Sequence, residues 1–141
     1  MIPTSALVFG CTGVLPFVLL TLINVLNINF PIPNPMFAIL AYGATILSFI
    51  GGIQWGIIIH KTKIGRNLWM GLGTSVFPPL LGWSSLLASG LTGYIILICG
   101  FLFALIVDHK LANLNLTPTW YFRLRSFLTL AVVAVLIINW F

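Results

Sequence analysis

Long apolar runs separated by short polar segments dominate the hydrophobic pattern of the chain. The runs are long enough to cross the roughly 30 Å hydrocarbon layer of a bilayer at about 1.5 Å of rise per residue. Three of the segments between them contain prolines, asparagines or basic residues, which end an apolar helix or place it at an interface, and the fourth, Ser89-Gly90, allows only a tight turn. The pattern predicts an all-α bundle of five transmembrane helices in one domain, residues 1–141, with helices at about residues 6–26, 36–60, 68–88, 91–107 and 118–141.

Small residues recur every four positions in the second of these runs. Four residues are close to one helical turn, so their side chains lie on one face of the helix. A face of small side chains lets a neighbouring backbone approach closely, and such packing holds helices together in lipid. We therefore predict that the other helices pack around this one through a helix-packing stripe of Ala44, Ser48, Gly52 and Gly56.

Composition strengthens the membrane assignment. The chain is 60% hydrophobic and only 5% charged, whereas a soluble domain carries about 25% charged residues. The net charge of +5 comes from six basic residues, too few and too close to helix ends to indicate binding to nucleic acid. We read them as topology signals and contacts with anionic lipid.

The basic residues also predict the orientation of the bundle. With five spans, the loops after the second and fourth helices lie on the same side of the membrane as the N-terminus. Every basic residue belongs to that side, and the positive-inside rule makes it the cytoplasmic or matrix side. The sequence therefore predicts an inward N-terminus, an outward C-terminus and an inner basic surface made of Lys61, Lys63, Arg66, Lys110, Arg123 and Arg125.

The N-terminus and the cysteines bear on the compartment. The N-terminus lacks the basic leader and the cleavage site of a signal peptide, and it does not resemble a mitochondrial import sequence. We expect a bacterial inner membrane, or a mitochondrial inner membrane if the gene is in the organelle. Cys11 and Cys99 lie in apolar runs, where they are expected to pack as small hydrophobic side chains.

A polar group is expected inside the membrane beside the third helix. Pro78 and Pro79 have no amide proton, so they deprive the carbonyls of Thr74 and Ser75 of their usual helical donors. An unpaired carbonyl is costly in lipid. We predict that the third helix is broken there and that the Gln54 amide, at similar depth, donates to one of these carbonyls. The group could be a packing device or a contact for a substrate.

A second polar group is expected at the inner surface. His60, Asp108 and His109 comprise both histidines and the only acid of the chain, at the inner ends of the second and fourth helices. Two histidines and a carboxylate could ligate a metal if those helix ends touched. Adjacent residues rarely face one ion, so we predict no metal site and no cofactor. Asp108 is instead expected to offset a nearby basic residue, namely Lys110, Arg123 or Arg125.

Three segments resemble a known family. They are YGATILSFIGGIQWG (Tyr42 to Gly56), VFPPLLGWSSLL (Val76 to Leu87) and PTWYFRLRSFLTL (Pro118 to Leu130). In this order they resemble the transmembrane protein 69 family, a domain family of unknown function. Members often have His or Arg where this chain has Gln54, so a titrating role at that position is not carried over. The resemblance implies a small multi-pass protein of bacterial inner membranes with an animal relative in mitochondria, and it implies no reaction.

The function hypothesis follows from this resemblance and from the absence of a catalytic set in the sequence. One acid cannot form a carboxylate pair, and no ionisable residue is expected within the spans. The leading hypothesis is a non-enzymatic accessory or assembly subunit that binds lipid and another integral membrane protein of an energy-transducing, respiratory complex. The alternative is a small transporter or channel with a polar path at the broken third helix. A membrane enzyme acting on a lipid or a quinone is a third possibility.

Overall fold

The computed structural model describes residues 1–29, 31–61 and 66–139, and in these residues the chain is all α-helical. Lys63 and the last two residues of the predicted fifth helix lie outside the described residues. The five helices of the described chain are α1 (Thr4–Val25), α2 (Pro35–Lys61), α3 (Arg66–Ala88), α4 (Gly90–Asn113) and α5 (Thr119–Ile138).

Asparagine stops two of these helices. Asn27 follows α1 and Asn115 follows α4, and both have positive φ angles, 48° and 53°. Asparagine tolerates this left-handed conformation, which turns the chain out of a helix. The prediction that the fourth helix ends at residue 107 is wrong, because the charged segment that begins at Asp108 continues the helix and the stop comes only at Asn115.

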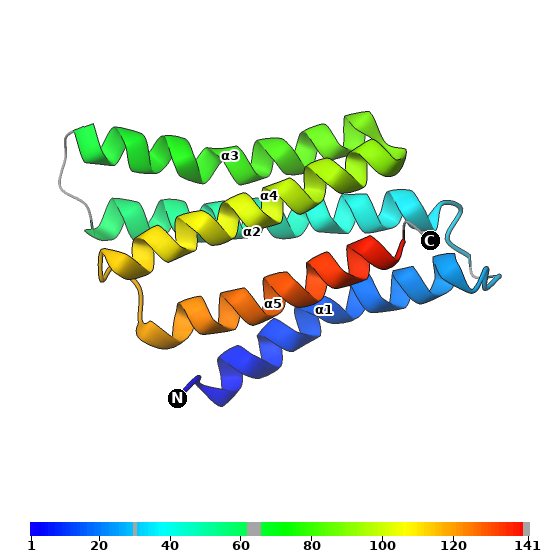
Figure 1. The fold of residues 1–141 in the computed structure, drawn as a ribbon, viewed down its shortest axis with the longest axis horizontal. Helices are drawn as coiled ribbons and strands as arrows, with labels where there is room; N and C mark the ends of the chain where they lie inside the picture. Colours follow the sequence, from blue (N-terminus) through cyan, green and yellow to red (C-terminus); the bar gives the residue numbers. More distant parts are fainter. Residues whose placement is uncertain (30, 62–65, 140–141) are drawn as a thin grey trace.

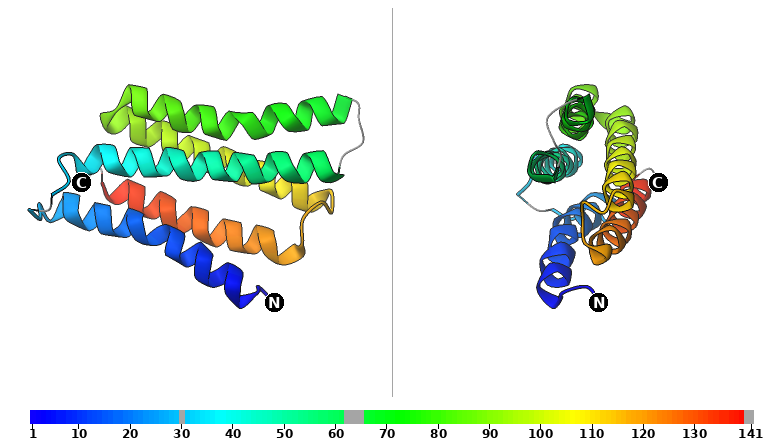
Figure 2. Two further views of the ribbon diagram at one scale, coloured as in Figure 1. Left: turned by 180° about the vertical axis from the view of Figure 1, so that it is seen from behind. Right: turned by 90° about the vertical axis from the view of Figure 1, so that its left-hand side faces the viewer.

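Four helices, α1, α2, α4 and α5, form a ring, and α3 lies outside it. α1 contacts α2, α2 contacts α4, α4 contacts α5, and α5 returns to α1. Within the described residues, α3 contacts only α2 and α4. Figure 1 shows α3 at the edge of the bundle opposite α1, and the end-on view in Figure 2 shows the same arrangement. Phe17 and Phe101 meet inside the ring with their centroids 6.1 Å apart.

Close packing in α2, α3 and α4 depends on glycines that the predicted stripe does not contain. A Cβ added to Gly51 would lie 2.6 Å from the carbonyl oxygen of Ser75, and one on Gly82 would lie 2.9 Å from the Cα of Ala44. Backbones therefore touch at both places. Of the predicted stripe, only Ala44 makes such a contact.

The outer part of the stripe faces away from the other helices. Ser48, Gly52 and Gly56 are exposed, and a Cβ on either glycine would meet nothing within 4 Å. The prediction that these three residues pack the bundle is wrong. The face of α2 that closely contacts α3 contains Gly51, the residue before Gly52.

The third helix is continuous, so the prediction of a break at Pro78 and Pro79 is wrong. The carbonyl oxygen of Ser75, which Pro79 deprives of its helical donor, lies in the space where Gly51 has no side chain. Contacts between Cα hydrogens and a carbonyl oxygen are weakly favourable at such helix crossings. Close packing against α2 thus accommodates the exposed carbonyl without a break in α3.

Four of the helices, α1, α2, α4 and α5, are long and apolar enough to cross a membrane. They are the four helices of the ring. Large apolar side chains of these four helices, such as Phe9, Ile106 and Leu130, are exposed on the outside of the bundle, as contact with lipid requires. The chain is therefore a membrane-embedded helical protein.

Candidate functional site

A buried polar cluster joins α2, α4 and α5 close to the connection between α4 and α5. The side-chain amide of Gln54 on α2 donates to Oδ1 of Asp108 on α4 at 2.9 Å and to the carbonyl oxygen of Ala104 at 2.9 Å. The Nε of Arg125 on α5 donates to Oδ2 of Asp108 at 2.7 Å. We call Gln54, Asp108 and Arg125 the polar clamp.

Burial makes the polar clamp strongly dependent on its own contacts. Gln54 and Asp108 are 0% exposed and Arg125 is 9% exposed. A buried charge needs a partner and hydrogen bonds, because an uncompensated ion costs several kcal/mol by general experience. Both carboxylate oxygens of Asp108 accept a bond, so the acid is satisfied within the clamp.

The predicted partner of Gln54 is wrong, although its burial inside the bundle was expected. The amide of Gln54 donates to α4 rather than to α3, where Thr74 and Ser75 lie. The hydroxyls of these two residues donate to the carbonyls of Gly71 and Leu72, each at 2.8 Å. Since α3 is also continuous, the polar path expected beside it for a transporter has no support in the described residues.

The predicted surface position of Asp108 is wrong as well, whereas Arg125 was one of its expected partners. Because α4 continues to Asn113, Asp108 stays within the helix and faces inward. It belongs to a stripe spaced by three and four residues, a spacing that places side chains on one helical face. The buried members of this stripe are Leu97, Phe101, Ala104, Asp108 and Leu111. This spacing is the signal in the sequence that could have revealed the buried acid.

The other predicted surface residues lie on the outside of the helices. His60, His109 and Arg123 are exposed. A ring nitrogen of His109 lies 3.1 Å from the side-chain nitrogen of Asn113, and its ring packs on Phe122 with the centroids 5.0 Å apart. No cluster of three or more His, Cys, Asp or Glu suited to a metal ion occurs among the described residues.

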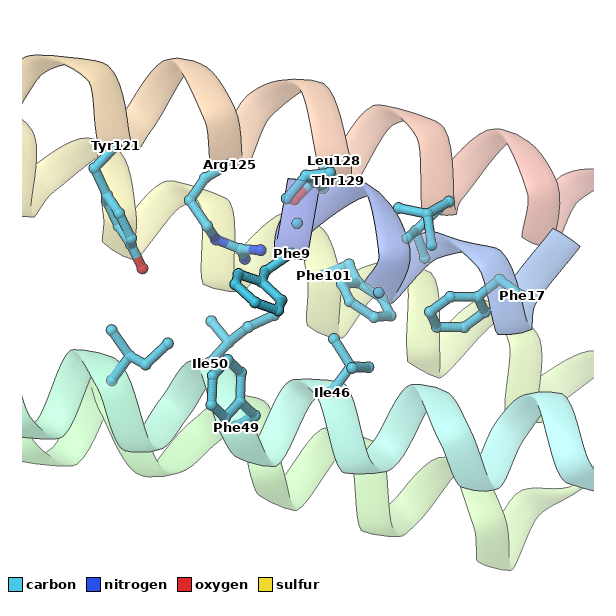
Figure 3. Close-up of a pocket in the computed structure, with 15 residues that line it drawn as sticks. Phe9, Phe17, Ile46, Phe49, Ile50, Phe101, Tyr121, Arg125, Leu128 and Thr129 are labelled. Carbon is cyan, nitrogen blue, oxygen red and sulfur yellow. The ribbon is translucent and has the colours of Figure 1, made fainter. Parts of the chain in front are cut away.

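A cavity of about 200 Å³ adjoins the polar clamp inside the ring of helices. Arg125 belongs to both, and Figure 3 shows its guanidinium group facing the cavity beside the hydroxyl of Tyr121. Thr129 also lines it, one turn further along α5. Most of the remaining lining is apolar, from Phe9 on α1, Phe49 and Ile50 on α2 and Phe101 on α4, together with their neighbours. Sequence reasoning missed this cavity, although Tyr121, Arg125 and Thr129 are spaced by four residues.

Comparison with known proteins identifies relatives over nearly the whole chain. Residues 2–141 match the family described as "Protein of unknown function (DUF3429)". Transmembrane protein 69 of Xenopus tropicalis is 39% identical over 138 residues, which are 96% of this chain and 53% of that protein. Transmembrane protein 69 of Mus musculus is 30% identical over 128 residues, 91% of this chain and 52% of that protein. The chain thus spans about half the length of these relatives, and no solved structure matches it.

Proposed function

Because the chain belongs to the DUF3429 family and is homologous to transmembrane protein 69, we propose that this multi-pass membrane protein works by binding rather than by catalysis. Its role would be that of an accessory or assembly subunit of a larger, energy-transducing complex in a bacterial or mitochondrial inner membrane. The protein partner would be another integral membrane protein, reached through the apolar outer surface.

This proposal rests on the carboxylate of Asp108, whose two oxygens are both already hydrogen-bonded. The chain has one acidic residue, Asp108, and both of its oxygens accept hydrogen bonds within the polar clamp. General acid–base catalysis needs a group within reach of a substrate proton. Proton-coupled transport likewise needs an ionisable group that can exchange its proton. A carboxylate fixed between Gln54 and Arg125 supports a structural role instead.

The proposal includes five spans with the N-terminus inside. α3 is the least apolar of the five helices, but it runs alongside α2 and α4 over its length (Figure 2). Its exposed residues include Trp69, Phe77 and Trp83, as a lipid-facing surface would require. The last turn of α2, the first turn of α3 and the α4–α5 connection lie at the same end of the bundle as the N-terminus (Figure 1), so the basic residues there would give the inward side.

The outward glycines of α2 offer a docking face for a partner helix. Gly52 and Gly56 are exposed and would let another backbone approach closely. The experiment is to extract the tagged protein from its own membranes in a mild detergent and to follow its migration on native gels. We expect the wild-type protein to co-migrate with a larger complex whose subunits mass spectrometry identifies.

Two variants test whether the docking face is responsible. Gly52→Leu adds a bulky side chain where nothing lies within 4 Å of a Cβ, so folding should be retained while docking is blocked. Leu102→Phe, at an exposed position on α4, is the control that enlarges a different outer face. Loss of co-migration in Gly52→Leu alone supports the proposal. A wild-type protein that migrates alone in every mild detergent contradicts it.

A further inference from the structure

Three polar groups on α5 face the cavity without a hydrogen-bond partner among the residues that the structure describes. They are the Nη2 of Arg125, the hydroxyl of Tyr121 and the hydroxyl of Thr129. Each atom is buried, and Thr129 is only 1% exposed. Leaving a buried polar group unpaired costs about 1–3 kcal/mol. Three such groups on successive turns of one helix, around one cavity, point to a bound molecule that satisfies them.

The chemistry of the three groups defines the part of the ligand that they contact. A guanidinium can only donate hydrogen bonds, and the two hydroxyls can also donate. The ligand must therefore present acceptor oxygens. Because Asp108 already pairs with Arg125 at 2.7 Å, the local charge is balanced and the ligand need not be an anion. A neutral carbonyl group meets both conditions.

The remaining walls define the rest of the ligand. The cavity lies between α1, α2, α4 and α5, and several of its apolar walls are phenylalanine rings (Figure 3). Phe9 and Phe49 on its lining are 78% and 66% exposed, so this side of the cavity borders the lipid. A volume of about 200 Å³ is below the roughly 300–1,000 Å³ of drug-sized sites. It suits a head group whose apolar tail extends between α1 and α2 into the bilayer.

We propose that the cavity binds a neutral, membrane-soluble lipid whose head group presents carbonyl oxygen to Arg125, Tyr121 and Thr129. An isoprenoid quinone and an ester-linked acyl lipid both carry this chemistry. Arg125 has two roles in this site, since its Nε holds Asp108 in the polar clamp and its Nη2 contacts the ligand. The inference is independent of the proposed partner complex.

The test measures binding with variants that do not disturb the polar clamp. Tyr121→Phe and Thr129→Val each remove one unpartnered hydroxyl from the cavity while nearly preserving shape. Tyr94→Phe is the matched control, because the Tyr94 hydroxyl is also buried with no partner in the described part of the chain but does not line the cavity. The purified proteins are placed in nanodiscs of ether-linked phosphatidylcholine, which has no ester carbonyl, and titrated with decylubiquinone or with a short-chain diacylglycerol.

We expect saturable binding of one of the two probes, with dissociation constants raised about three- to tenfold by Tyr121→Phe and by Thr129→Val, the range for one lost hydrogen bond. Tyr94→Phe should bind as the wild type does. The probe that behaves in this way identifies the source of the carbonyl group. The inference is overturned if neither probe binds saturably, or if the three variants bind both probes as well as the wild-type protein does.

A larger side chain in the cavity provides a second test, which measures the lipids that co-purify with the protein. Gly13 lines the cavity, and a Cβ there would meet nothing within 4 Å, so Gly13→Leu should fold and occupy ligand space. Lipids extracted from the wild-type protein as purified are compared by mass spectrometry with those from this variant and from Tyr94→Phe. A carbonyl lipid that is retained by the wild type and Tyr94→Phe and lost from Gly13→Leu supports the inference. An identical lipid profile in all three proteins contradicts it.

Discussion

The two sides of the bundle are packed in different ways. Between α2, α3 and α4, glycines bring backbones into contact, as at Gly51 against Ser75 and at Gly93, where a Cβ would lie 2.6 Å from the carbonyl oxygen of Ser85. Between α1 and α5, the contact is made by the ends of side chains, as at Gly10 against Leu128, and a cavity remains beside it. Close packing thus fixes one side, and the other keeps space that a ligand can use.

The polar clamp spans this division, and its loss should have the largest effect. Asp108→Ala leaves Arg125 buried without its counter-ion, and removing one partner of a buried ion pair costs about 3–5 kcal/mol. We expect that loss in the free energy of unfolding of the purified protein in mild detergent, with α5 released first. The double variant Asp108→Leu/Arg125→Met, which removes both charges, should recover much of it. A single variant as stable as the wild type would show that the clamp does not join the two sides.

Adjacent glycines on α2 test the packed side. Gly51→Ala places a methyl group 2.6 Å from a carbonyl oxygen and 2.7 Å from the ring of Pro79, and backbone atoms cannot move away cheaply. We expect a loss of about 1–3 kcal/mol, as for other overpacked sites. Gly52→Ala is the matched control, since its methyl group meets nothing, and it should be neutral or stabilising by up to about 1 kcal/mol. Equal thermal stability of the two variants would contradict the register described for α2 and α3.

Two glycines on α1 test the looser side, where we expect the smallest effect. A methyl group at Gly10 would lie 2.9 Å from a terminal methyl of Leu128, and the end of a leucine side chain can turn away. Gly10→Ala should therefore change the unfolding free energy by no more than about 0.5 kcal/mol, since the gain in helix propensity offsets the contact. Gly13→Ala should be at least as stable as the wild type. A cost for Gly10→Ala as large as that for Gly51→Ala would remove the distinction between the two sides.

Helix existence could be read from the sequence, whereas helix register could not. Apolar runs and prolines located the five helices, because lipid requires continuous helical hydrogen bonding wherever the chain is apolar. Gly51 and Gly52 are both small, and the rotation of α2 about its own axis decides which of them meets Ser75. The hydropathy pattern cannot distinguish the two positions, because both residues are glycine.

The polar clamp shows the same limit for the candidate site. Gln54, Asp108 and Arg125 each stand out in the sequence as polar residues, but the charged segment that begins at Asp108 predicts a helix end and hence a surface position for this acid. The residue that ends the helical segment is Asn115. Asp108 lies on the same buried face of α4 as Leu97, Phe101, Ala104 and Leu111. A charged residue can lie inside a helix when a neighbouring helix supplies its partner, as α5 supplies Arg125 for Asp108.

The closure of the ring by α1 and α5 has a consequence for biosynthesis. The side chain of Asn139, just after α5, donates to the hydroxyl of Thr21 at 2.8 Å and accepts from Asn24 at 3.2 Å, so α1 is joined to a helix that is made much later. At roughly 5–20 residues per second of translation, α1 waits about 6–23 s for α5 (Val25 to Ile138). During that interval the surface of α1 that α5 will cover faces lipid or the insertion machinery, and the cavity does not exist until α5 has been made.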